Sequence, residues 1–193
     1  MWEGILQNIG KYITLTEDEI AYFKSVVQFK KLRKRQYLVQ EGEVVKYESY
    51  VIKGCLRAYQ VTEKGQEHVV QFAIEDWWIG DLYSFLTGTP ATLNIDCLED
   101  CELLQITKES LEELYIKVPK FERMFRILFQ NAFVHSQKRL LSTIATSAQE
   151  HYTEFIKKYP NIDQRVPNHQ IASYLGITAE SLSRIRAQLV SKK

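Results

Sequence analysis

The spacing of apolar residues changes twice along the chain. Up to about residue 27 it is helical, and Thr16, followed by three acidic residues, is typical of a helix start. From about residue 30 to 106, short runs of β-branched and aromatic residues alternate with turn signals such as Gly54. Several short strands at regular spacing predict a small barrel or sandwich. Residues 79–96, which contain Gly88 and Pro90, interrupt the strands and predict a short helix and a loop.

Helical periodicity returns at Glu109 and becomes long and apolar beyond Pro119. A helix of about 25 residues is about 38 Å long at 1.5 Å per residue. Further apolar residues beside its main stripe give it two apolar faces, so we expect one face to pack on its own domain and the other to form a homodimer. The stripe that we expect in the dimer helix consists of Phe121, Phe125, Leu128 and Ala132.

The C-terminal part is predicted to be entirely helical. A second amphipathic helix spans about residues 147–158 and ends at Pro160. Pro160 and Pro167 bracket the stretch NIDQRV, which we interpret as a linker to a small C-terminal module.

Residues 171–186, IASYLGITAESLSRIR, fit a helix-turn-helix unit. Two tightly crossing helices need a glycine in the turn, a small residue at the contact and apolar residues at the buried positions. Gly176 and Ala172 meet the first two requirements. The apolar positions are Ile171, Leu175, Ile177, Leu182 and Ile185.

The second helix of this unit carries side chains suited to the major groove of DNA. It is predicted to start after Thr178 as N-cap, and Glu180, Ser183 and Arg184 lie opposite its apolar side. Arginine bonds guanine, a carboxylate accepts from cytosine, and a hydroxyl serves a base or a phosphate. A salt bridge between Glu180 and Arg184 on a solvated face is the alternative, and the two roles can coexist. The residues expected to contact the DNA backbone are Thr178, Arg186, Lys192 and Lys193.

Charge is concentrated at the same end of the chain. The net charge of the whole chain is +1, but residues 165–193 hold five cations and one anion. We therefore expect the last 29 residues to contact DNA and the mildly acidic body to stay away from it.

Three cysteines cannot pair evenly, and the first residues lack the pattern of a secretory signal. The longest uncharged run, residues 82–95, is too short to cross a bilayer. We expect a cytoplasmic protein without a membrane span.

Three stretches resemble the catabolite-activator / fumarate-nitrate-reduction superfamily of bacterial transcription regulators. YVIKGCLRAYQVTEKGQEHVVQF, together with VQEGE, is similar to the early strands of its cyclic-nucleotide-binding barrel, and WWIGDLYSFLTGTPATLNI is similar to its phosphate-binding cassette. The third stretch is the helix-turn-helix motif, whose Glu-x-x-Ser-Arg falls on Glu180, Ser183 and Arg184.

The resemblance implies an α+β fold, a homodimer on double-stranded DNA with two-fold-related half-sites, and RNA polymerase as a candidate partner. It implies three parts: a β-roll sensor domain with N-terminal helices at residues 1–117, a dimerisation helix at 118–145 and a helix-turn-helix domain at 146–193. A β-hairpin wing after the recognition helix, usual in the family, is not expected in this chain.

The cassette departs from the family pattern. The usual glutamate and arginine are replaced by Asp81 and Ala91, and residues 77–107 contain no Lys, Arg or His. A cyclic phosphate needs a paired cation or several aimed donors, so we expect no cyclic AMP or cyclic GMP binding. Arg57 is the one candidate substitute and is expected to point to solvent. An uncharged or apolar effector, or a filled pocket, is favoured, and the candidate pocket residues are Arg57, Gly80, Asp81, Leu82, Tyr83, Ala91 and Thr92.

Two other classes of function compete with a regulator. A small cupin-like metalloenzyme needs clustered His and carboxylate ligands, but only one of the four histidines, His68, lies among the strands. Three cysteines are too few for a four-thiolate iron–sulfur cluster, and His68, which could ligate a haem, is more often a half-buried strand residue. We therefore expect no catalytic residues, no metal and no cofactor. The remaining alternative is an oligomeric interaction module that binds protein and not DNA.

Overall fold

The computed structural model describes residues 2–145 and 147–190, with side chains described for 2–139 and 147–189. The chain begins with helices α1 (Trp2–Gly10) and α2 (Glu17–Val26). Thr16 starts α2 as the sequence predicts: its hydroxyl accepts from the Glu19 amide, and the Glu19 carboxylate accepts from the Thr16 amide. Ile5 and Ile9 of α1 are buried in the main core.

Eight strands form the predicted barrel as a β-roll of two antiparallel four-stranded sheets. The sheet orders are β1-β8-β3-β6 and β2-β7-β4-β5, and α3 (Leu82–Thr87) interrupts the strands after β6. The strands are β1 (Gln28–Leu32), β2 (Tyr37–Val39), β3 (Tyr47–Lys53), β4 (Leu56–Val61), β5 (Glu67–Ala73), β6 (Trp78–Ile79), β7 (Asn94–Cys97) and β8 (Cys101–Thr107).

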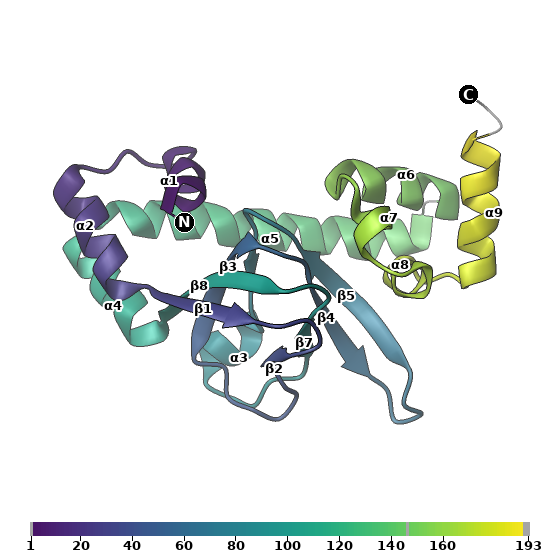
Figure 1. Ribbon diagram of the computed structural model, residues 1–193, viewed down its shortest axis with the longest axis horizontal. Helices are drawn as coiled ribbons and strands as arrows, with labels where there is room; N and C mark the ends of the chain where they lie inside the picture. Colours follow the sequence, from purple (N-terminus) through teal and green to yellow (C-terminus); the bar gives the residue numbers. More distant parts are fainter. Residues whose placement is uncertain (1, 146, 191–193) are drawn as a thin grey trace.

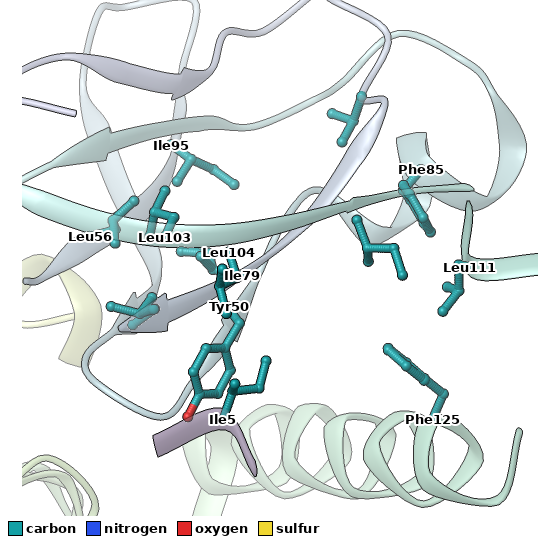
Figure 2. Packing of buried hydrophobic residues seen from close by; sticks show 14 of the residues in the cluster. Ile5, Tyr50, Leu56, Ile79, Phe85, Ile95, Leu103, Leu104, Leu111 and Phe125 are labelled. Carbon is teal, nitrogen blue, oxygen red and sulfur yellow. The ribbon is translucent and has the colours of Figure 1, made fainter. Parts of the chain in front are cut away.

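Helix α4 (Lys108–Lys117) leads from the β-roll to α5 (Lys120–Ala145), a helix of 26 residues. Figure 1 shows α5 running along the molecule, with α1, α2 and α4 at one end and the C-terminal helices at the other. Phe121 and Phe125 are buried against the β-roll, and Figure 2 shows Phe125 pointing from α5 into that core. The expected dimer stripe is therefore wrong in its first half, because those residues are needed to close the core of their own domain.

The C-terminal helices are α6 (Ala148–Lys158), α7 (Ile162–Arg165), α8 (Asn168–Leu175) and α9 (Ala179–Val190). They share a second core with the β-roll. The rings of Phe72, Phe155, Tyr159 and Tyr174 lie with centroids 5.1–6.1 Å apart. Phe72 comes from β5, so the C-terminal helices are packed onto the β-roll by aromatic contacts.

The stretch interpreted as a linker is part of this core. Ile162 and Val166 are buried, and residues 162–165 form the short helix α7. The two prolines therefore bracket a packed helical turn, because its apolar side chains find partners that the local sequence does not show.

Strand β5 lies at the edge of its sheet, and the C-terminal helices cover that edge. The Val69 amide donates to Ser173 Oγ of α8 at 3.0 Å, and Ser173 Oγ donates to the Glu67 carbonyl at 3.0 Å. Arg139 of α5 donates to the carbonyls of Val69 and Val70. Backbone groups of an edge strand need such partners, so this docking belongs to the fold.

Candidate nucleic-acid interface and effector pocket

The turn between α8 and α9 is built as the sequence predicts. Gly176 adopts φ +69°, a left-handed conformation that costs glycine little, and its amide donates to the Ser173 carbonyl. Ala172 is 2% exposed at the helix contact. Ile171, Leu182 and Ile185 are buried, while Leu175 and Ile177 pack against the same core.

Helix α9 presents one polar face to solvent. Thr178 starts the helix, since its hydroxyl accepts from the Ser181 amide at 3.2 Å. Glu180, Ser183 and Arg184 are all exposed, opposite the buried Leu182. The three side chains expected to read bases therefore share an accessible surface.

Local hydrogen bonds orient this face. Bonds from its own backbone amide and from the Thr178 hydroxyl hold the pKa of Glu180 below its usual range, with a smaller effect of Arg184. Arg184 Nη2 donates to Ser181 Oγ at 3.2 Å. Glu180 and Arg184 form no salt bridge within the described part of the chain, so the alternative explanation for this pair finds no support.

Two cations of the basic end turn inward. Arg186 Nε donates to Tyr152 Oη at 3.0 Å and its Nη1 to Asn168 Oδ1 at 2.6 Å. Arg165 pairs with Glu75 and Glu99 of the β-roll. The guanidinium of Arg186 thus joins α9 to α6 and α8, contrary to the expectation that it faces a phosphate. Lys192 and Lys193 lie outside the described residues.

The polar groups of the cassette stabilise its own helix and loop, as the contacts of Asp81 show. Asp81 is 2% exposed and caps α3, since its Oδ1 accepts from the Ser84 amide at 3.0 Å. Its Oδ2 accepts from the Thr92 amide at 3.0 Å, which fixes the loop after Pro90. Ala91 is buried, whereas Tyr83 is 62% exposed. The predicted pocket residues are therefore not gathered around one cavity.

Arg57 is buried, and the expectation that it points to solvent is wrong. Only 7% of the residue is exposed. Its Nε and Nη2 donate to the two oxygens of Asp96 at 2.8 and 3.1 Å, and its Nη1 bonds Glu67. Burial opposes its charge, but the hydrogen bonds that it donates to these two carboxylates raise the pKa of Arg57 above its usual value. Its donors are committed to carboxylates, so it cannot easily serve a phosphate.

A cavity of about 430 Å³ lies elsewhere, between the β-roll, α5 and the C-terminal helices. Of the predicted pocket residues, Gly80 and Leu82 line it, and Leu128 and Ala132 of α5 form part of its wall. Its other wall consists of Trp77, Lys158, Tyr159 and Tyr174, and no pattern in the sequence indicates that these residues meet.

Two findings concern other classes of protein. None of the helices among the described residues is long and apolar enough to span a membrane. In the same part of the chain, His, Cys, Asp and Glu side chains do not form a group of three that could hold a metal ion.

Comparisons with known proteins agree with this architecture. Residues 29–117 match the family model of the cyclic nucleotide-binding domain. The fumarate and nitrate reduction regulatory protein of Vibrio cholerae is 26% identical over 186 residues, covering 89% of this chain and 73% of that protein. Regulatory protein HlyX of Actinobacillus pleuropneumoniae is 25% identical, covering 89% of this chain and 76% of its own.

Among solved structures, FixK2 from Bradyrhizobium japonicum superposes with a TM-score of 0.74 at 20% identity, covering 86% of each chain. The catabolite activator protein of Thermus thermophilus gives a TM-score of 0.58 at 19% identity, covering 96% of this chain and 87% of that one. Both share the fold. The matched domain and the two relatives support the assignment of the chain to the catabolite-activator / fumarate-nitrate-reduction superfamily of regulatory proteins.

Proposed function

We propose that the protein is a homodimeric transcription regulator that binds two-fold-related DNA half-sites through α9. The observation that carries the proposal is the exposed row of Glu180, Ser183 and Arg184 on a capped helix whose other side is buried. A recognition helix needs both features, because its buried side fixes its position and its free side enters the groove. The relatives, which are regulatory proteins, support the same assignment.

The dimer surface is the second part of the proposal. Helix α5 leaves Phe133 65% exposed and Val134 48% exposed, although both are large and apolar. Ile127, Val134 and Leu141 follow one another at intervals of seven residues in the sequence, as in the seam of a coiled coil. This face replaces the stripe of Phe121 and Phe125 as the proposed contact between two copies.

The sensor part is proposed to be degenerate toward cyclic nucleotides. The cation candidate Arg57 is bonded to Asp96 and Glu67, and Ala91 stands where the family carries arginine. A cyclic phosphate at the cassette would meet carboxylates, because residues 77–107 contain no Lys, Arg or His and Arg57 is paired with Asp96 and Glu67.

Selection of bound duplexes from a random pool tests the function directly. We expect enriched sites with two half-sites about 10 bp apart, centre to centre. Arg184→Ala should cost about 1–3 kcal/mol at one G·C pair in each half-site and relax the preference there. Arg33→Ala, an exposed arginine on the turn after β1, is the matched control and should leave binding unchanged.

Each failure has a distinct meaning. Equal losses on selected and random DNA for Arg184→Ala would assign that residue to the phosphates. Enriched sites without two-fold symmetry would contradict the dimer, and absence of enrichment would favour a module that binds protein.

A further inference from the structure

The cavity of about 430 Å³ has the size of a small-molecule site. It lies where three parts of the fold meet, since the β-roll, α5 and the C-terminal helices each supply part of its wall. Trp77 and Trp78 belong to the β-roll, Phe129 to α5, and Lys158 and Tyr159 to the end of α6. Most of these side chains are aromatic, so the wall suits a planar apolar group.

Unpaired polar atoms gather around this cavity. Among the described residues, seven buried side-chain nitrogen or oxygen atoms have no hydrogen-bond partner. Four of them belong to residues that line the cavity: Asn8 Oδ1, Glu48 Oε1, Trp78 Nε1 and Tyr159 Oη. Buried polar groups without partners cost free energy, so a small rotation of these side chains toward a molecule in the cavity would lower that cost.

One end of the cavity is positively charged. The Lys158 ammonium lies 5.1 Å from the ring centroids of both Trp77 and Tyr159. Within the described part of the chain it pairs with no carboxylate. Burial and the positive charge of Arg139 lower the pKa of Lys158, which means that the surroundings destabilise its charged form. An anion there would relieve this cost.

His135 adds to the same end. It lines the cavity on α5, and burial together with the charges of Lys158 and Lys138 lowers its pKa. The imidazole is therefore neutral near pH 7 and can donate a hydrogen bond to an anion beside Lys158.

The cavity wall also contains a carboxyl group, that of Glu48. Glu48 is 6% exposed, and burial, followed by the charge of Asp81, raises its pKa to about 8. It is therefore mainly a neutral acid near pH 7 and can donate a hydrogen bond. Gly80 permits this burial, because a Cβ at that position would lie 2.6 Å from Glu48 Oε1.

We propose that this cavity binds an aromatic organic anion, with the anionic group beside Lys158, the planar apolar body between Trp77, Trp78 and Phe129, and a polar substituent near Glu48. This site differs from the predicted cassette pocket, whose residues Asp81, Ala91 and Thr92 do not line it.

The position of the cavity gives a ligand access to the helix-turn-helix unit. Lys158 and Tyr159 lie at the end of α6, and Tyr174 belongs to α8, so an occupant touches both the β-roll and the C-terminal helices. An effect on DNA binding rests on the proposed function. Binding of the ligand itself does not, and it is measured without DNA.

Fluorescence titration of the full chain with two dyes tests the site. Anilinonaphthalene sulfonate has the proposed chemistry, and phenylnaphthylamine has a similar body without the anionic group. We expect one molecule of either dye in the cavity. Lys158→Met should weaken the sulfonate dye about tenfold or more and leave the neutral dye within about twofold. Lys157→Met, the exposed neighbour on the same helix, is the matched control and should change neither.

Lys158→Arg keeps the charge and should keep most of the affinity for the sulfonate dye, which protects the test against a variant that fails to fold. Equal affinities for the sulfonate dye in Lys158→Met and Lys157→Met would overturn the proposal. So would equal losses of both dyes, which would indicate a merely apolar surface, or no binding of either dye to the folded protein.

Discussion

Arg165 joins the C-terminal helices to the β-roll, and its replacement tests how firmly the two are held. Its Nη1 and Nη2 donate to the two oxygens of Glu75 at 2.8 and 2.9 Å. Its Nε and Nη2 donate to Glu99 at 2.9 Å each. One guanidinium thus holds two carboxylates in bidentate geometry, which is the strongest form of such a pair.

The cost of Arg165→Met follows from this geometry and from exposure. The side chain of Arg165 is 22% exposed, but those of Glu75 and Glu99 are 40% and 33% exposed, so water screens part of the attraction. Exposed ion pairs contribute about 0–1 kcal/mol, and hydrogen bonds to charged groups up to about 3 kcal/mol. Loss of the arginine also leaves two carboxylates facing each other. We expect the free energy of unfolding to fall by about 1–2 kcal/mol.

The effect should depend on pH. Burial opposes the charge of Glu75, but the hydrogen bonds from Arg165 and Gly54 keep its pKa below the ordinary 4.5. A carboxyl whose pKa is lowered in the folded state contributes stability above its unfolded pKa and loses it as pH falls through the folded value. The difference between the protein and Arg165→Met should therefore be complete at neutral pH and shrink below about pH 4.5.

Urea unfolding of Arg165→Met, Glu75→Gln and the double variant at neutral and acid pH measures this. The double-mutant cycle should give a coupling of about 1 kcal/mol at neutral pH. Additive single effects, or a difference that persists at acid pH, would refute the reasoning. The salt dependence of DNA binding should not change in Arg165→Met, because its charge faces carboxylates.

Three further predictions concern the dimer surface, the cavity and the cassette. Phe133→Glu should be a monomer in sedimentation experiments and should melt at the normal temperature, because Phe133 is exposed. Leu128→Glu should lower the free energy of unfolding by about 2–4 kcal/mol, because Leu128 packs on the β-roll. A dimeric Phe133→Glu would mean that the interface lies elsewhere. Tyr159→Phe removes a buried hydroxyl without a hydrogen-bond partner, so the free energy of unfolding in urea should fall by no more than about 0.5 kcal/mol. A larger fall would show that the hydroxyl forms a hydrogen bond in the folded protein. Calorimetry with cyclic AMP and cyclic GMP should give dissociation constants above about 10 μM, and tighter binding that Arg57→Ala abolishes would contradict the account of Arg57.

Local signals in the sequence were sufficient for most of the fold. Thr16 and Thr178 cap their helices through bonds to residues three positions away, and Gly176 ends α8 through bonds of the same range. Strand and helix periods are local as well. Each of these features depends on residues that are close together in the sequence. The α+β architecture and the helix-turn-helix could therefore be predicted from the sequence.

The hydrogen-bond partners of individual arginine side chains could not be predicted in the same way, because those partners are distant in the sequence. Arg57 reaches Asp96 across a strand pair, and Arg165 reaches Glu75 from a position 90 residues later in the chain. The net charge of the C-terminal end counts every cation as available to DNA. However, Arg165 and Arg186 form hydrogen bonds with other side chains of the protein. Of the described cations between residues 165 and 190, only Arg184 presents its charge on the exposed face of α9. Affinity for DNA in this region should therefore depend more on geometry than the net charge of the end suggests.

The cavity shows why a site between elements escapes sequence patterns. Lys158 is an ordinary residue for the last turn of an amphipathic helix, where cations are favoured by the helix dipole. It becomes unusual only because Tyr159 stacks on Trp77, with ring centroids 5.1 Å apart, and this contact holds the helix end against the β-roll. The ammonium is thereby placed against aromatic faces and beside Arg139 instead of in water. A pattern along one helix reports which residues are polar, whereas the chemistry of this site arises from what three separate elements place around the same cation.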